Sequence, residues 1–444
     1  MPTPRKPTSP TTEAIDQFCA HFDDLLPRYE ERTALRQYVI GLLLPREHNK
    51  TLVELGAIVP GAERQRLHHF LHDAPWDADA LNRRRLAQWQ AHPYLGPHSQ
   101  GVLIVDETGD PKRGQRIVLA AQQYLGKRGH VANGVVAVTS HWADGSRHLP
   151  LGVKPYRPAS RLPKGKQDPA FHTKPELAWE LIEEAQAAGI PFRLVVADCV
   201  YGESAQLEAR LFAARIPYVM GLRPSHGTWQ VVEDEAHPPA FTPAEAAQRL
   251  PANAWQRTIH SDSHGKALIR YVAELELGPS YGPTTGVRLI AATLDPATLK
   301  PESTWYLATS MPLAQASPEQ VYAVYRLREW IEHFYKPAKH ELGWADYQMR
   351  PEWAIVRHWQ LVLLAYTFSL LVGALPTPPT ASPPLSPSTS HESTGGGKIG
   401  ARPYPRVRGA GRLDRHAAAH PQLALPVGTA AAVLDALVER RPTA

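Results

Sequence analysis

Cysteine is scarce in this chain: of 444 residues, only Cys19 and Cys199 are cysteines. Two cysteines exclude a disulfide-based scaffold and a zinc site built from four thiolates, and they suit a reducing compartment. Long apolar runs are also missing. The longest, Leu361 to Val372, falls short of the ~20 residues of a membrane-spanning helix, so we predict a buried core helix there. The polar N-terminus has no apolar signal core, and we expect a cytoplasmic protein.

Acidic residues are slightly outnumbered, which gives a net charge of +5 and a pI near 9.1. This mild basic excess is compatible with nucleic-acid binding but does not establish it. The 43 prolines are many, and they predict linkers or a loose tail beside a globular core.

The pattern of apolar residues changes along the chain. The first hundred residues have helical spacing, and from residue 101 short apolar strands alternate with helices, which predicts a mixed α/β sheet covered by helices. A Pro/Ser/Thr/Gly-rich stretch near the C-terminus predicts disorder. We divide the chain into a disordered N-terminus (1–13), a helical domain for which a DNA-binding role is open (14–97), the first part of a catalytic core (98–225), a β-rich insertion (226–303), the second part of the core (304–373) and a low-complexity basic tail (374–444).

Two predicted strands end on an aspartate. VLIVD stops at Asp106, and LVVAD stops at Asp198. In open α/β sheets, active sites collect at the ends of strands, where the loops leave a crevice. The alternative is that each aspartate caps the turn that follows its strand, which is a common structural role. Two aspartates in matching contexts favour a shared site.

A third carboxylate lies on a predicted helix that begins after Ser317. Tyr325, Arg328, Glu332 and Lys339 have spacings of +3, +4 and +7, so they fall in one arc at about 100° per residue. The alternative is a solvated ion pair between Arg328 and Glu332, which stabilises a helix by only ~0.3–0.5 kcal/mol. Three carboxylates without a nearby His/Cys cluster favour two Mg²⁺ or Mn²⁺ ions over zinc.

The stretch YRLREWIEHFYKPAK therefore reads Tyr-x2-Arg-x3-Glu-x6-Lys. This is the signature of one branch of the DDE transposases of bacterial insertion sequences. With VDETGDPKRG, VANGVVAVTSHWADG and VVADCVYGE, the chain most resembles the insertion sequence 701 group of that branch, over roughly residues 60 to 372.

The resemblance implies an RNase H-like fold with the β-rich insertion placed before the last catalytic helix. It implies that Asp106, Asp198 and Glu332 hold two Mg²⁺ (or Mn²⁺) ions, and that Tyr325, Arg328 and Lys339 contact the DNA of the transposon ends. The implied reaction is cleavage at those ends followed by strand transfer into target DNA, by a homodimer associated with the bacterial nucleoid. Glu329 is the competitor for the third ligand, and the signature selects Glu332.

Further basic residues follow the first aspartate. We predict that Lys112, Arg113, Lys164 and Lys166 hold the DNA backbone, although such runs are often solvated loops. We expect Glu107 to face the opposite side of the strand end from Asp106, and Asp110 to be a turn residue. Five arginines of the helical region are open to either reading, as phosphate contacts or as a solvated face: Arg64, Arg66, Arg83, Arg84 and Arg85.

Three other functions remain open from the sequence. An RNase H-like nuclease that cuts without joining gives no reason for the Tyr-Arg-Glu-Lys set. An inactive descendant that binds DNA without cutting it is favoured by the atypical tail, which contains no Trp, and is disfavoured by the intact carboxylates. A glycosidase with two carboxylates is the most remote option, because the cations near Glu332 have no role in it.

Overall fold

The computed structural model describes residues 12–114, 116–126, 128–226, 229–230, 240–261, 267–275 and 286–373. Most of the predicted disordered N-terminus and all of the predicted low-complexity tail lie outside the described residues. Parts of the predicted β-rich insertion also lie outside them.

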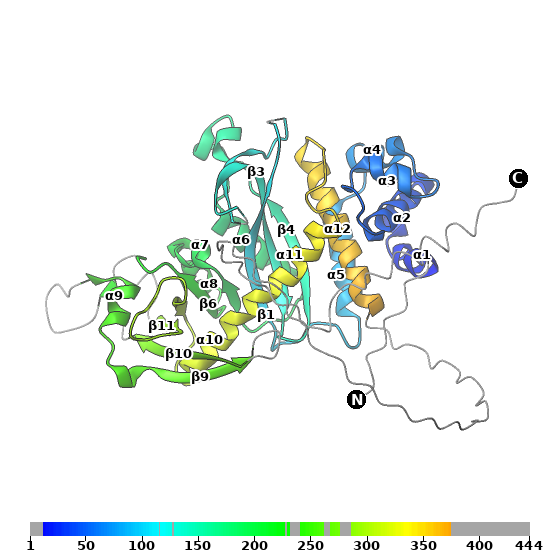
Figure 1. Cartoon of the computed structure of the whole chain (residues 1–444). Coiled ribbons are helices and arrows are strands. Elements are labelled where there is room, and N and C mark those ends of the chain that lie inside the picture. The colour runs from blue at the N-terminus through cyan, green and yellow to red at the C-terminus, as the bar shows by residue number, and fades with distance from the viewer. Residues whose placement is uncertain are drawn as a thin grey trace, which may run out of the picture.

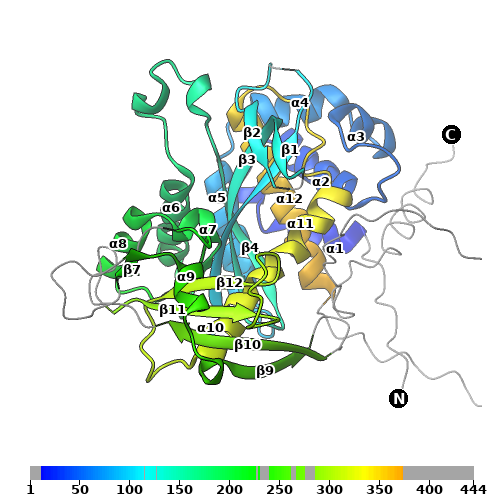
Figure 2. The ribbon, with the colours of Figure 1, turned by 60° about the vertical axis from the view of Figure 1, so that its left-hand side comes forward.

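Ten strands form one mixed sheet with helices on both faces (Figures 1 and 2). The order of the strands across this sheet is β2-β3-β1-β5-β6-β12-β11-β10-β9, and β4 pairs with β3. The strands are β1 (Val102–Pro111), β2 (Ala121–Leu125), β3 (His130–Ala143), β4 (His148–Pro155), β5 (Val195–Ala197), β6 (Tyr218–Leu222), β9 (Gln256–Ser261), β10 (Ala267–Leu275), β11 (Arg288–Thr293) and β12 (Trp305–Thr309). This is the predicted RNase H-like α/β fold.

Strand β1 lies at the centre of the sheet and is covered on both faces. Val102 and Ile104 belong to one apolar core, and Leu103 and Val105 belong to the other. Successive side chains of a strand point to opposite faces, so a continuous apolar run is the pattern of a strand buried on both sides. On one side of β1 lie the parallel strands β5 and β6, and on its other side lies the hairpin of β3 and β4.

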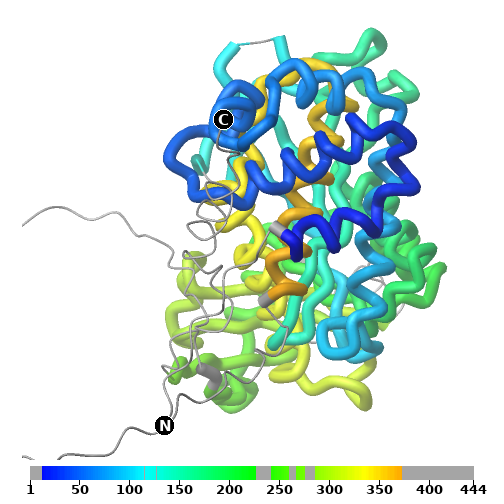
Figure 3. Tube along the Cα trace, turned by 90° about the vertical axis from the view of Figure 1, so that its right-hand side faces the viewer, coloured from blue at the N-terminus to red at the C-terminus, as the bar shows by residue number. Residues whose placement is uncertain are grey.

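The helices divide between the two faces. Helices α6 (Lys174–Ala187), α7 (Cys199–Gly202) and α8 (Ala205–Ala213) lie on the side of Leu103, and α10 (Pro318–Tyr325) and α11 (Trp330–His340) contribute to the core on the side of Val102 (Figure 2). The N-terminal helices pack around α12 (Glu352–Gly373), as Figure 3 shows. They are α1 (Thr12–Ala20), α2 (Tyr29–Leu43), α3 (Leu52–Ile58), α4 (Arg64–His72) and α5 (Ala78–Gln90).

Helix α12 includes the apolar run Leu361 to Val372 and begins nine residues before it. By length and composition alone it could cross a membrane, but 67% of its most apolar window is buried inside the protein. Its middle is fully buried between α5, α2 and β4, which confirms the predicted core helix. Arg85 of α5 is fully buried and donates to Pro150 O, Leu151 O and Thr367 Oγ1, so a phosphate contact by this arginine is wrong.

Three details of the sequence prediction need correction. Strand β1 does not end at Asp106 but continues to Pro111, and Asp110 is a buried strand residue and not a turn residue. Strand β2 was not predicted. The predicted helix after Ser317 is interrupted by a 3₁₀ turn, Arg326–Glu329, so its residues do not follow one continuous 100° arc.

The start and the proline of this helical segment have local explanations. Ser317 accepts from the Gln320 amide in the predicted capping box. We expected Pro337 to kink or end the helix, but α11 continues through it to His340. Proline offers no N–H to the carbonyl four residues earlier, and that carbonyl, His333 O, accepts from Tyr366 Oη at 3.4 Å instead.

The β-rich insertion adds strands to the main sheet. Within its described residues, β9, β10 and β11 form antiparallel pairs that extend the sheet beyond β12, and β7 (Trp229–Gln230) pairs with β8 (Ala240–Phe241) separately. Because β12 pairs with β6, the chain returns from the insertion to the strand next to β5 just before α10.

Candidate active site

The register of β1 and β5 brings the two predicted aspartates together. The strands are parallel, with Leu103 opposite Val195 and Val105 opposite Ala197. Asp106 and Asp198 are the next residue on each strand, so they lie at the same level of the sheet. Asp106 is 7% exposed and Asp198 is half-buried.

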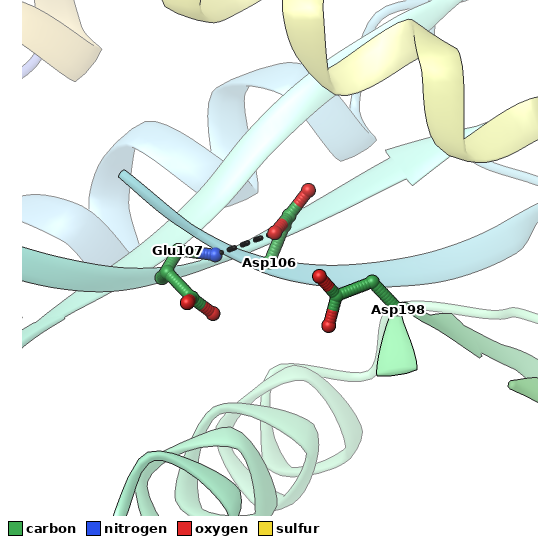
Figure 4. A group of neighbouring side chains, drawn as sticks. All are labelled: Asp106, Glu107 and Asp198. Carbon is green, nitrogen blue, oxygen red and sulfur yellow. Dashed lines mark hydrogen bonds between the residues drawn. The ribbon is translucent and has the colours of Figure 1, made fainter. Parts of the chain in front are cut away.

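A third carboxylate belongs to this group, and it is Glu107. One oxygen each of Asp106, Glu107 and Asp198 lie within 4.8 Å of one another (Figure 4). Strand alternation does direct Glu107 to the α6 side and Asp106 to the α11 side, as predicted. Both carboxylates nevertheless have an oxygen within 4.8 Å of one of Asp198, so Glu107 joins the two predicted aspartates.

Each carboxylate is oriented by a donor. Asp106 accepts from Arg328 Nη1 at 2.6 Å and from the Glu107 amide at 2.8 Å. Glu107 accepts from Lys174 Nζ at 2.7 Å and from Tyr201 Oη at 2.8 Å. Asp198 accepts from the Val200 amide at 2.9 Å and so caps α7. The capping role and the shared site, which were alternatives in the sequence, are both present at Asp198.

The three negative charges repel one another in a poorly solvated place. Burial, together with the nearby charges of Asp106 and Glu107, raises the pKa of Asp198 to about 7, against the opposing effect of Arg328. Such a group favours a bound cation, and hard carboxylate oxygens are the ligands that Mg²⁺ and Mn²⁺ prefer. The residues present therefore fit a divalent metal site.

Glu332 lies on α11, outside this group of three. Its side chain is exposed. Helix α11 is held against the sheet three residues further on, where Tyr335 Oη and Thr139 Oγ1 are 2.6 Å apart in the buried interior. Thr139 is the residue of β3 directly opposite Asp106. The helix of Glu332 is thus fixed to the sheet at the level of the aspartates.

Tyr325 lies near Asp198, on the side of the site formed by β6. A Cβ at Gly221 of β6 would stand 2.6 Å from Tyr325 Oη and 3.4 Å from the carbonyl carbon of Asp198. Gly221 therefore leaves room for the phenol beside the second aspartate. Trp305 packs on the Tyr325 ring, with 5.7 Å between centroids.

Besides Arg328, two more of the predicted DNA contacts bind protein groups in this structure. Lys339 Nζ pairs with Asp110 Oδ1 at 2.7 Å and donates to Gly109 O at 3.1 Å. Lys112 Nζ donates to Ala345 O at 2.7 Å and lies 3.4 Å from the centre of the Tyr347 ring. Burial lowers the pKa of Lys112 to about 8. Arg113, Lys164 and Lys166 are exposed.

Comparison with known proteins agrees with this geometry. Residues 21–264, more than half of the chain, match the family model described as DDE superfamily endonuclease, a range that includes Asp106 and Asp198 and ends before Glu332. The chain belongs to the DDE superfamily of endonucleases. It is 32% identical over 349 residues to the probable transposase for insertion sequence element IS701 of Microchaete diplosiphon, which covers 78% of this chain and 84% of that protein. This DDE endonuclease is therefore a member of the insertion sequence 701 group, as the motifs predicted.

Membership has consequences for the site of this DDE endonuclease. Nuclease chemistry on DNA with a divalent metal is what the superfamily implies, and among the described residues Asp106, Glu107 and Asp198 form a cluster that could hold such a metal. The sequence did contain a signal for Glu107: it directly follows a predicted catalytic aspartate. Its partner Lys174 opens a helix nearly seventy residues later, and only the fold brings the two side chains together.

Proposed function

We propose that this protein is a transposase that cuts DNA at the ends of its own element and joins the freed 3′ ends to target DNA. The observation that carries the proposal is the pairing of Asp106 and Asp198 on adjacent parallel strands, with Arg328 of the Tyr-Arg-Glu-Lys set bonded to Asp106. An endonuclease that only cuts gives no reason for that set.

We propose that two Mg²⁺ or Mn²⁺ ions are held by Asp106, Asp198 and Glu332. Glu107 lies beside the two aspartates and completes the group of carboxylates. The ions, when bound, supply positive charge to the attacking and leaving oxygens of the phosphodiester. The buried strand β1 positions the carboxylates that it carries. The contact between Tyr335 and Thr139 fixes the position, relative to the sheet, of the helix that carries Glu332. Lys174 and Tyr201 hold the Glu107 carboxylate in one orientation.

The proposed contacts to the element ends come from Tyr325, Arg328 and Lys339, at the wall of the site. Arg328 and Lys339 each neutralise a carboxylate of β1 in this structure, and an arriving phosphate would compete for the same cations. Exposed basic residues further out are proposed to follow the backbone of the duplex. They are Arg113, Lys164 and Lys166, with Lys112 at their inner edge.

Two element ends must be handled together for joining, and we propose a homodimer in the DNA complex. The protein would act on double-stranded DNA in the cytoplasm, at the nucleoid. No covalent bond between protein and DNA is needed: water breaks the bond between phosphorus and the 3′ oxygen at the element end, which leaves a 3′-OH and a 5′ phosphate, and that 3′-OH then replaces a 3′ oxygen at a phosphorus of target DNA.

The test is an excision and joining assay on a plasmid that carries the DNA flanking the gene. Wild type and the variants Glu332→Gln and Glu329→Gln are compared with and without Mg²⁺. We expect wild type and Glu329→Gln to release and join the ends only with Mg²⁺, and Glu332→Gln to bind without cutting. Binding by wild type without any cutting would instead favour an inactive DNA-binding descendant.

A further inference from the structure

A basic hairpin stands beside the active site and has no role in the chemistry described above. It consists of β2, the turn after it and the first residues of β3. Gln122 and Tyr124 of β2 point outward while Ala121, Gln123 and Leu125 are buried, which is the alternation of a half-exposed strand. We call the described residues of this segment, 121–126 and 128–134, the β2–β3 hairpin.

Two large apolar side chains are exposed on the hairpin and lie directly opposite each other. Tyr124 pairs with Val131 across the two strands. Tyr124 is 59% exposed and Val131 is 60% exposed. A single exposed apolar side chain is ordinary, but a cross-strand pair of an aromatic and a β-branched residue left in water suggests a binding surface.

The charge around this pair has one sign. Between Pro111 and Ala143 the sequence contains five Lys or Arg residues and no Asp or Glu. Arg113, Arg116 and Arg128 are exposed, and within the described part of the chain they take part in no ion pair. Such a surface would repel a second copy of itself and is complementary to the phosphates of a nucleic acid.

The hairpin packs directly on β1, the strand that carries Asp106. A Cβ at Gly109 would stand 2.7 Å from Leu125 Cδ2, and one at Gly134 would stand 2.9 Å from Leu125 Cδ1. The two glycines thus let Leu125 lie directly on β1. Gln123 Nε2 donates to Gly134 O at 2.9 Å and secures the base of the hairpin.

This packing fixes the distance between the hairpin and the carboxylates. Gly109 follows Asp106 by three residues on β1, which corresponds to about 10 Å of extended strand. Tyr124 is the neighbour of Leu125 and extends further. At about 3.4 Å per base pair, the hairpin is within reach of DNA roughly three to five base pairs from a phosphodiester held at Asp106.

A second basic segment adjoins the hairpin. Arg161 Nε donates to Ala120 O at 2.6 Å, which ties the loop that carries Lys164 and Lys166 to the residue preceding β2. Lys164 and Lys166 are exposed. The loop that carries these two cations is therefore attached at the base of the hairpin.

We infer that the β2–β3 hairpin grips the element-end duplex, with Tyr124 and Val131 against the bases or sugars and Arg128 on the backbone. The inference rests on the proposed transposase function. The element end is the occupant because its cut must fall at a fixed distance from the sequence being bound, and a hairpin seated on the strand of Asp106 supplies a fixed distance.

The test uses the full chain and a duplex that contains the DNA flanking the gene, without divalent metal so that no strand is cut. Affinity and hydroxyl-radical footprints are measured for wild type, Tyr124→Ala, Tyr124→Phe and Tyr94→Ala. Tyr94 is a matched control, since it is 69% exposed and lies outside the hairpin.

We expect Tyr124→Ala to bind about tenfold more weakly and to lose protection three to five base pairs from the cleavage position. Tyr124→Phe keeps the ring and should match wild type, as should Tyr94→Ala. Arg128→Gln should reduce the dependence of log affinity on log salt by about one unit.

Two results would overturn the inference in distinguishable ways. An unchanged footprint and an affinity within about twofold for Tyr124→Ala would remove the hairpin from the DNA interface and leave the transposase function intact. Failure of wild type itself to bind the flanking duplex would remove the proposed function and the hairpin contact together.

Discussion

Replacing Arg328 with glutamine should tighten the binding of a divalent metal to the free protein. Arg328 Nη1 lies 2.6 Å from Asp106 Oδ2, so the guanidinium occupies an oxygen that a metal needs. Removing it leaves Asp106 without its ion-pair partner, while Lys174 still pairs with Glu107. A metal would then bind Asp106 without first displacing an ion pair.

The size of the effect follows from the charge separation. Two unit charges ~4 Å apart near a protein surface interact by about 4 kcal/mol. The Arg328 side chain is 30% exposed, so water screens part of this interaction. Discounting for that screening leaves about 1–2 kcal/mol, or roughly a 5- to 30-fold gain in metal affinity.

Calorimetric titration of Mn²⁺ into the protein without DNA measures this affinity directly. Lys336→Gln serves as the control, because Lys336 is an exposed cation of α11 that, among the described residues, forms no ion pair with a carboxylate of the site. Equal or weaker Mn²⁺ binding by Arg328→Gln would refute the competition between the guanidinium and the metal.

Two further substitutions test the surroundings of the site, and a third tests a buried lysine of the helical region. Gly221→Ala places a methyl group 2.6 Å from Tyr325 Oη and should reduce DNA cleavage by about a hundredfold, measured in single turnover, with the fold retained by circular dichroism. Tyr335→Phe leaves the Thr139 hydroxyl without its 2.6 Å partner and should lower the free energy of unfolding in urea by about 1–2 kcal/mol. Lys50 is buried, which lowers its pKa to about 7. Between pH 7 and about 10 the unfolded chain therefore binds a proton at Lys50 that the folded chain does not. The free energy of unfolding should rise with pH over this range in wild type but not in Lys50→Met.

Each of these expectations can fail clearly. Normal cleavage by Gly221→Ala would mean that Tyr325 is not needed where it lies. If Tyr335→Phe were as stable as wild type, the buried contact with Thr139 would not hold α11 to the sheet. Parallel stability curves for wild type and Lys50→Met across pH 7 to 10 would show that Lys50 is charged in both states.

The sequence predicted the centre of the fold because the physical signal there is local. An apolar run buried on both faces reads directly as a central strand, and β1 and β5 both carry that run up to an aspartate. Parallel pairing then aligns the two ends. The capping box at Ser317 was equally readable, because its donors and acceptors lie within one helical turn.

The details that the sequence missed depend on contacts between distant residues. Strand β1 continues past Asp106 through polar residues because Asp110 is neutralised by Lys339, more than two hundred residues later. The 3₁₀ turn that interrupts the last helical segment changes the angle between Tyr325 and Glu332, and no breaking residue announces it. The sequence predicted that Lys112 contacts the DNA backbone, but its side chain lies over the ring of Tyr347. Tyr347 follows α11, far along the chain, so no local pattern indicates this contact.

The most direct test of the central claim is strand cleavage of an end-labelled duplex from the DNA flanking the gene. Wild type and Asp198→Asn are compared in Mg²⁺ and in EDTA, at protein concentrations where both bind the duplex. Cutting by wild type in Mg²⁺ alone, and by Asp198→Asn in neither condition, is the predicted result. Equal cutting by both proteins, or cutting by wild type in EDTA, would contradict a metal site built on Asp106 and Asp198.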